Sequence, residues 1–287
     1  MTLYRGMDAD ALEVQYNARA TVDDIQPYLE QYRSLTDAAK ASMTCQTDVA
    51  FGPSEAEVMD IYPAGPNAPV FVFIHGGYWR LLSKDDSGFM APTFSRAGIT
   101  TVAVNYALAP AVTLTEITRQ CRAAVAHLWH NADRFGIDRT RIYVGGSSAG
   151  GHLTGMLATR GWEAAFDLPA GVVAGAIPVS GLFDLTPLRH CHQNEWLSLT
   201  NDSVATLSPM FHIPSDGCPM LAAWGEFETA EFARQSRDFA ADWADKGGKV
   251  ETLEVAGRNH FDVILDLTDP TTALTQMCFG LAQGNKP

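Results

Sequence analysis

Short apolar, β-branched runs alternate with amphipathic helical patterns from residue 45 to the end of this 287-residue chain. The runs cover residues 70–74, 100–105, 141–144, 172–179, 220–224 and 250–255. Continuous apolar runs of this length are typical of strands that are buried on both faces of a parallel sheet. The alternation therefore predicts an α/β fold with a mostly parallel central sheet and helices on both faces.

Two helical patterns are long enough to define a buried face. The first begins at Thr113, which forms a capping-box pattern with Glu116, and the second ends at Gly247. Their apolar faces are Ile117, Cys121, Val125, Leu128 and Ala132 in the first, and Phe232, Ser236, Phe239 and Trp243 in the second. We expect both faces to pack on the sheet rather than to form a cofactor groove.

Two stretches interrupt the alternation. Residues 1–40 are predicted to form a helical N-terminal arm without a strand, and residues 183–215 form a polar segment between two strands. The second stretch is interpreted as a small insertion over the carboxyl edge of the sheet, where α/β folds place their sites. We treat residues 1–287 as a single domain, because α/β folds of this length commonly form one unit. The chain shows no internal repeat or low-complexity tract.

Composition excludes several classes of protein. The 46% of hydrophobic residues argue against disorder, and 20 basic against 33 acidic residues give a net charge of −13. Such a charge disfavours nucleic acid and anionic membranes as partners. The N-terminus has no apolar signal region, no transmembrane segment is predicted, and five scattered cysteines without a C-x-x-C pair suggest reduced thiols. We expect a cytoplasmic protein. A homodimer is one possible assembly, and the sequence does not determine the oligomeric state.

The strongest chemical signal is the G-x-S-x-G sequence at residues 146–150. It follows a predicted strand and precedes an apolar helical stretch, the context in which this turn exposes a serine hydroxyl at a helix N-terminus. Ser148 is therefore the candidate nucleophile, and the amide of Ala149 is a candidate oxyanion donor. A phosphate-binding loop is disfavoured, because neither of the usual glycine-rich phosphate motifs fits these residues.

A second glycine-rich turn, His75-Gly76-Gly77-Tyr78-Trp79, directly follows the first apolar run. Glycines let the backbone approach an acyl oxygen and aim N–H groups at it, and one such donor contributes about 3 kcal/mol of transition-state stabilisation. By their spacing, the amides of Gly77 and Tyr78 are candidate oxyanion donors. His75 is interpreted as a structural histidine that hydrogen-bonds the loop.

A serine nucleophile needs a histidine base and an acid that orients it. After a serine turn of this type, the acid comes first along the chain and the histidine follows it. His260 lies in a loop after the last apolar run and is the best candidate base among eight histidines. The acid is Glu228 or Glu226, both just beyond the fifth run. Glu228 is preferred because the acid usually lies a few residues past the strand, whereas Asp262 is too close to His260 in sequence.

With these motifs the chain resembles the kynurenine formamidases (arylformamidases), in the esterase–lipase group of α/β-hydrolases. HGGYW fits the HGGxW signature of that family, and GGSSAGGH is typical of the group. Further similarities extend over almost the whole chain: Gln15-Tyr16-Asn17, Gly52-Pro53, Asp60-Ile61-Tyr62, residues 180–188, Gln193-Asn194, Leu197, Leu199-Thr200, Ala205 and Ser208-Pro209.

The resemblance implies an α/β-hydrolase fold in which Ser148 is the nucleophile, Glu228 the acid and His260 the base. The acid of the family is often aspartate, so a glutamate here is a departure, and the choice between Glu228 and Glu226 stays open. The implied reaction is hydrolysis of N-formyl-L-kynurenine to kynurenine and formate, in tryptophan breakdown. No metal or organic cofactor is implied, and His190 and His192 lack a third ligand at a suitable spacing.

Aromatic residues near these motifs are candidates for the substrate pocket. Trp79 and Tyr78 add bulk beside the oxyanion turn, and Phe183 and Trp196 are expected to line the leaving-group side from the insertion, although core packing is an equal alternative for these last two. The rival functions are a short-acyl carboxylesterase, or another amide or carbamate hydrolase, with the same triad. A non-catalytic binding protein of the same fold is disfavoured, because no triad member is missing.

Overall fold

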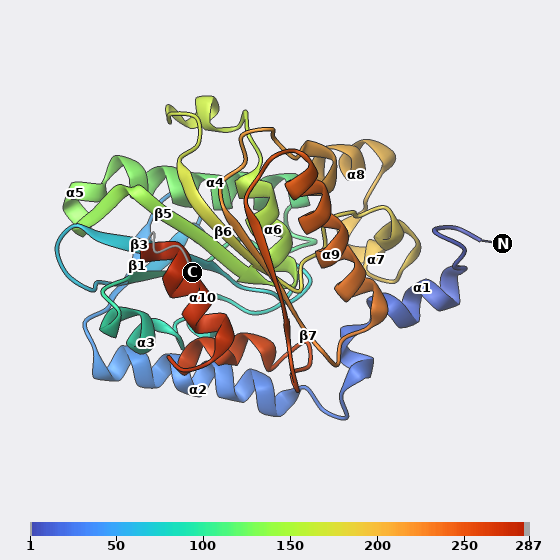
Figure 1. Cartoon of the computed structure of the whole chain (residues 1–287), viewed down its shortest axis with the longest axis horizontal. Coiled ribbons are helices and arrows are strands. Elements are labelled where there is room, and N and C mark those ends of the chain that lie inside the picture. Colours follow the sequence, from blue (N-terminus) through green and yellow to red (C-terminus); the bar gives the residue numbers. More distant parts are fainter. Residues whose placement is uncertain (1, 284–287) are drawn as a thin grey trace.

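The computed structural model describes residues 2–283, which form a layered α/β structure around one sheet (Figure 1). Among these residues, eight strands join in the order β1-β2-β4-β3-β5-β6-β7-β8. The strands are β1 (Gln46–Ala50), β2 (Val58–Tyr62), β3 (Ala68–Ile74), β4 (Thr100–Val104), β5 (Ile137–Ser147), β6 (Val173–Val179), β7 (Met220–Gly225) and β8 (Val250–Val255). Strand β2 pairs antiparallel with β1 and β4, and the remaining pairs are parallel. The predicted mostly parallel sheet is confirmed.

Helices cover both faces of the sheet. The α-helices are α1 (Ala9–Tyr16), α2 (Gln26–Ser42), α3 (Ala91–Arg96), α4 (Leu114–His130), α5 (Ala132–Phe135), α6 (Ala149–Ala158), α7 (Asn194–Leu197), α8 (Asn201–Leu207), α9 (Ala230–Asp245) and α10 (Ala273–Gln283). Short 3₁₀ segments are Ala18–Thr21, Lys84–Asp86, Glu163–Phe166, Pro187–His190, Pro209–His212 and Val263–Thr268. In Figure 1, α2, α3 and α10 lie below the sheet, and α4 and α6 lie above it.

The central strand β3 shows why both faces are buried. Its valines and Ile74 pack in one apolar cluster with residues of α4, α6 and α9, whereas Phe71 and Phe73 pack in a second cluster with residues of α2, α3 and α10. Successive side chains of a strand point to opposite faces, so a strand that is apolar throughout contributes to both layers. No helix within residues 2–283 combines the length and the apolar character that crossing a membrane requires.

Strands β1 and β2 lie outside the six predicted runs. Strand β1 is largely exposed at the sheet edge, and β2 carries a buried acid, Asp60. The Asp60 carboxylate pairs with Lys40 of α2 at 2.7 Å and with Lys84 at 3.1 Å. Since buried charges persist only when they are paired, these lysines let an acid occupy the strand, and they anchor α2 to the sheet.

The start of α4 differs in detail from the prediction. Thr113 caps the helix by accepting a hydrogen bond from the Glu116 amide, but the Glu116 carboxylate instead bonds Arg119. Only half of the capping box forms, because the guanidinium is the stronger partner for a carboxylate. The N-terminal arm folds as α1 and α2 with a 3₁₀ turn between them, and the stretch 183–215 contains α7 and α8 near the end of the sheet (Figure 1).

Candidate active site

Ser148 occupies a strained turn between β5 and α6. Its φ of 59° and ψ of −117° lie outside the regions favoured by L-residues, at a cost of roughly 1–3 kcal/mol. The turn is held because the Ser148 amide donates to the Val179 carbonyl at 2.9 Å. A Cβ on Gly150 would overlap the Ile74 carbonyl oxygen, so this motif position requires glycine. Ala149 is the first residue of α6, and its N–H therefore has no acceptor within the helix.

Gly77 and Tyr78 of the second glycine-rich turn line the same cavity as Ser148. Gly77, Tyr78 and Trp79 all have positive φ, at 93°, 50° and 58°. The Gly77 carbonyl accepts from the amides of Arg80 and Leu81, both at 3.0 Å. Because N–H and C=O point in opposite directions across a trans peptide, this pairing turns the Tyr78 N–H away from them. Within residues 2–283 the amides of Gly77 and Tyr78 donate to no acceptor, which leaves them available to a ligand oxygen.

His75 stabilises this turn through a hydrogen bond and a ring contact. Its Nδ1 lies 2.9 Å from the Gly76 carbonyl oxygen, and its ring stacks on Tyr106 with centroids 4.0 Å apart. Burial lowers the pKa of His75 to about 4, since a charged ring would lose its hydration there. The ring is therefore neutral near pH 7, and it has the structural role expected from the sequence.

His260 meets a carboxylate inside the protein. Its Nδ1 lies 2.7 Å from Glu228 Oε2, and the side chains of both residues are at most 5% exposed. The other oxygen of Glu228, Oε1, accepts from Ser180 Oγ at 2.5 Å and from the Gly225 amide at 2.6 Å. A carboxylate with both oxygens occupied is held rigidly, and it can fix the orientation of the imidazole and stabilise its protonated form.

The contacts of the candidate acids show which of them lies beside His260. Glu226 is exposed, and its carboxylate accepts from the Gly257 amide at 2.7 Å. Asp262 turns back onto its own loop and accepts from the Asn259 amide. Of these three acids, only Glu228 contacts His260 among the described residues.

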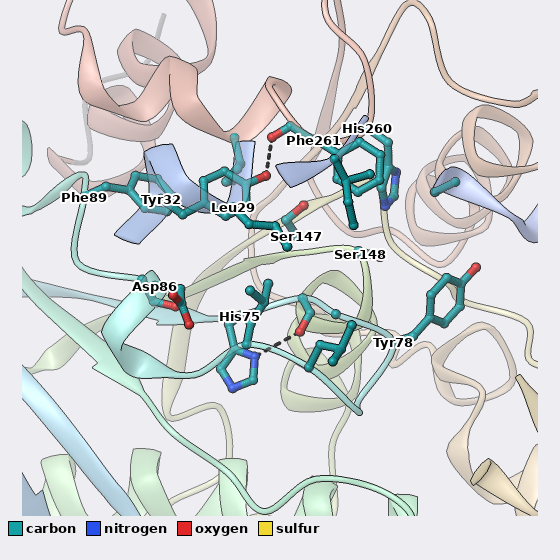
Figure 2. A pocket seen from close by; sticks show the side chains of 18 of the residues that line it. Leu29, Tyr32, His75, Tyr78, Asp86, Phe89, Ser147, Ser148, His260 and Phe261 are labelled. Carbon is teal, nitrogen blue, oxygen red and sulfur yellow. Dashed lines mark hydrogen bonds between the residues drawn. The ribbon is translucent and has the colours of Figure 1, made fainter. Parts of the chain in front are cut away.

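Ser148 and His260 line one cavity of about 90 Å³, together with Gly77 and Tyr78 (Figure 2). Its other walls are mainly apolar and come from the arm, the loop after β3 and the segment after His260. The remaining lining residues are Ala18, Ile25, Leu29, Tyr32, Phe73, His75, Gly76, Leu81, Leu82, Asp86, Ser87, Phe89, Ser147, Phe261 and Ile264. In Figure 2, His260, Ser148 and Tyr78 lie at one side, and Tyr32 and Phe89 lie at the other.

The arm is fixed against this cavity. Tyr32 stacks on Phe89 at 5.6 Å, and its hydroxyl donates to the Phe261 carbonyl. Ile25, which caps the start of α2, recurs at helical spacing with Leu29 and Tyr32 of that helix, and the three form an apolar face. The sequence analysis missed these walls, since periodicity alone does not tell which surface such a face covers.

Three predicted pocket residues lie elsewhere and are corrected here. Phe183 is fully buried and stacks on Phe239 at 4.2 Å, and Trp79 is fully buried against His152 at 5.0 Å. Both fill the core because large rings bury the most apolar area there. Trp196 is half-buried, and its indole N–H donates to the Tyr78 carbonyl at 3.1 Å instead of facing the cavity.

The described residues contain no group of three or more His, Cys, Asp or Glu side chains that could hold a metal ion. His192 pairs with Glu13, and the Cys191 thiol faces the Pro187 carbonyl. The five cysteines are unpaired thiols.

Comparisons with known proteins agree with this architecture. The BD-FAE family model matches residues 59–242, more than half of the chain. The kynurenine formamidase of Danio rerio is 30% identical over 96% of this chain and 97% of its own length. A protein from Silicibacter sp. TM1040 superposes with a TM-score of 0.80 at 25% identity, covering 92% of this chain and 97% of that one.

A thermophilic carboxylesterase from a metagenomic library superposes with a TM-score of 0.70 at 17% identity, covering 98% of this chain and 99% of that one. These superpositions confirm the α/β-hydrolase fold. The chain therefore belongs to the BD-FAE family and to the kynurenine formamidase-like α/β-hydrolases, and it is a serine hydrolase of the formamidase and esterase type.

Proposed function

We propose that the protein is an arylformamidase that hydrolyses N-formyl-L-kynurenine to L-kynurenine and formate. One observation carries the proposal: Ser148 and His260 line a cavity of about 90 Å³ whose walls include five aromatic side chains, those of Tyr32, Phe73, Tyr78, Phe89 and Phe261. Aromatic walls suit an aryl ring, and formyl is the smallest acyl group to accommodate beside the oxyanion donors.

In the first half of the reaction, His260 Nε2 takes the proton of Ser148 Oγ as the oxygen attacks the formyl carbon. Glu228 accepts from His260 Nδ1, which keeps the ring oriented and stabilises its positive charge. The carbonyl oxygen becomes an oxyanion, and the amides of Gly77, Tyr78 and Ala149 donate to it. These donors are set before the substrate arrives, so little reorganisation is needed as the charge develops.

In the second half, the protonated His260 gives its proton to the aryl amine nitrogen, and the carbon–nitrogen bond breaks. The amine leaves, and a formyl ester remains on Ser148. His260 then takes a proton from water, which attacks the ester carbon. Formate leaves, the proton returns to Ser148 Oγ, and one water has been consumed for each formamide bond cleaved.

A short-acyl aryl ester is the second candidate substrate, because the cavity walls are mainly apolar and suit the ring of an aryl ester as well as that of an aryl amide. The Danio rerio relative, which is of similar length and carries the name kynurenine formamidase, favours the formamide.

A paired assay tests the proposal. The purified protein is assayed for kcat/KM on N-formyl-L-kynurenine and on p-nitrophenyl acetate, with Ser148→Ala as the blank. We expect strong preference for the formamide and loss of turnover by several orders of magnitude in Ser148→Ala, with an unchanged Tm. Rapid ester cleavage without formamide turnover would refute the arylformamidase proposal and support the second candidate. Turnover that survives in Ser148→Ala would refute the assignment of the nucleophile.

A further inference from the structure

The oxyanion turn holds two consecutive non-glycine residues, Tyr78 and Trp79, in left-handed backbone conformations. L-residues rarely adopt this conformation, because the Cβ approaches the following carbonyl oxygen. Such a turn persists only when its surroundings determine it, so the contacts made by Tyr78 decide where its amide points.

Trp196 makes the first of these contacts. Its indole N–H donates to the Tyr78 carbonyl at 3.1 Å, and the Arg80 guanidinium lies over its ring at 4.9 Å. This hydrogen bond from the insertion fixes the orientation of the peptide between Tyr78 and Trp79. Since this peptide plane sets the backbone angles of Tyr78, the bond supports the left-handed conformation.

The N-terminal arm makes the second contact. The Tyr78 hydroxyl donates to the Tyr16 carbonyl, which also accepts from Gln193 Nε2 at 3.1 Å. Burial raises the pKa of Tyr78 well above its usual value, so the hydroxyl stays protonated and keeps donating. Tyr16 is itself fully buried, which makes its carbonyl a fixed point.

The same arm segment also binds the chain directly after Glu228. The Gln15 carbonyl accepts from Thr229 Oγ at 2.5 Å, and Gln15 Oε1 accepts from the Glu231 amide at 3.2 Å. The Tyr16 hydroxyl donates to the Glu231 carboxylate at 2.8 Å. Two adjacent arm residues therefore connect the oxyanion turn with the segment that follows the acid.

We propose that Trp196 and the arm segment Gln15–Tyr16 are positioning elements that hold the Tyr78 amide toward the oxyanion. The inference rests on the proposed hydrolytic function. It gives the arm and the insertion a role in transition-state stabilisation, although the insertion forms no wall of the cavity. The arm thus acts on the turn as well as on the shape of the cavity.

The test compares Trp196→Phe, which removes the indole N–H but keeps a ring, with Tyr78→Phe, which removes only the hydroxyl. Trp129→Phe is the matched control, because Trp129 is a half-buried tryptophan of α4 with Arg139 over its ring at 5.1 Å. Each variant is assayed for kcat and KM on p-nitrophenyl acetate and for the Ki of 2,2,2-trifluoroacetophenone. This ketone forms a tetrahedral oxyanion adduct with a reactive serine.

We expect each of the two test variants to lower kcat about tenfold and to raise the Ki about tenfold, as for one lost hydrogen bond. KM should stay within about twofold, since the lost interaction acts only in the transition state. In the double variant the combined loss should be smaller than the product of the two single losses, because both act on one turn. The control should match the wild type.

Unchanged kcat and Ki in Trp196→Phe, with or without a lower Tm, would overturn the inference and leave Trp196 a packing residue. Fully multiplicative losses in the double variant would also overturn it. Absence of Ser148-dependent turnover in the wild-type protein would instead refute the proposed function, and this inference would fall with it.

Discussion

Glu228→Gln replaces one carboxylate oxygen of the proposed acid by an NH₂ group. This should reverse the direction of the hydrogen bond to His260, so that the side chain donates and Nδ1 accepts. On the far side of the carboxylate, Oε1 receives two donors, the Gly225 amide at 2.6 Å and Ser180 Oγ at 2.5 Å. A backbone amide can only donate, so the oxygen of the new glutamine must remain on that side. Its NH₂ group then faces His260 Nδ1, which becomes an acceptor, and the ring proton moves to Nε2. A protonated Nε2 cannot take the proton of Ser148.

The expected loss follows from this tautomer. Flipping the glutamine would restore the bond to Nδ1 but would place two donors 2.6 Å apart at Gly225, and an unsatisfied buried donor costs about 1–3 kcal/mol before any repulsion. We therefore expect the wrong tautomer to dominate. A base held in the wrong tautomer lowers kcat by about 10⁴-fold in serine hydrolases, which corresponds to about 5 kcal/mol of barrier.

Steady-state kcat on p-nitrophenyl acetate and on N-formyl-L-kynurenine checks this value, with Tm to verify folding. Glu226→Gln is the matched control, because its amide oxygen can still accept from Gly257, and its kcat should stay within about twofold. A folded Glu228→Gln protein that retains more than a tenth of kcat would refute the tautomer reasoning. An equal loss in Glu226→Gln would move the acid to that residue.

Three further predictions concern stability and the cavity. Phe183→Ala should lower the free energy of unfolding by about 3–5 kcal/mol in urea titrations, because it removes the ring stacked on Phe239, and KM should hardly change; a raised KM at full stability would return Phe183 to the pocket. Leu29→Trp should fill the cavity and raise KM for the aryl substrate at least tenfold, by about 1.4 kcal/mol or more; an unchanged KM would exclude the cavity as the ring site. Burial lowers the pKa of His152 to about 4. The unfolded chain therefore binds a proton below about pH 6.5 that the folded protein binds only near pH 4, so stability falls between these values, by about 2 kcal/mol at pH 5. The glutamine amide of a His152→Gln variant can still donate to the Leu207 carbonyl. Urea unfolding at pH 7 and pH 5 should therefore show a smaller fall in the free energy of unfolding for this variant than for the wild type. An equal fall in both proteins would contradict the attribution of this pH dependence to His152.

The apolar runs predicted the strands that are buried on both faces of the sheet. They did not predict strands that are exposed to solvent or that carry a charged residue. Strand β3 reads as one apolar run because both of its faces pack against helices. Strand β2 contains Asp60, and the lysines that neutralise it lie 20 residues upstream and 24 residues downstream, at Lys40 and Lys84. A local pattern cannot show such partners, so an acid in a short run hides the strand.

The residues of the candidate site likewise divide into those that local sequence patterns predict and those that they do not. Ser148, Gly77 and Tyr78 stand out because tight turns demand small or glycine neighbours within a few positions. The pairing of Glu228 with His260 joins two loops at the same sheet edge. Chain order proposed an acid in the first loop and this histidine in the second, but it left Glu226 open as the acid. Cavity walls such as Leu29 depend on how the arm folds back over the sheet, which no local spacing encodes.

The hydrogen bond from Tyr32 to the Phe261 carbonyl spans 229 positions of the chain. During synthesis Tyr32 leaves the ribosome well before Phe261, because a chain is made from its N-terminal side onward. Contacts so distant in sequence form late, because the intervening chain must be ordered first. We therefore expect the nascent chain to be inert until Phe261 has emerged, so that the serine turn becomes active long after Ser148 itself has been synthesised.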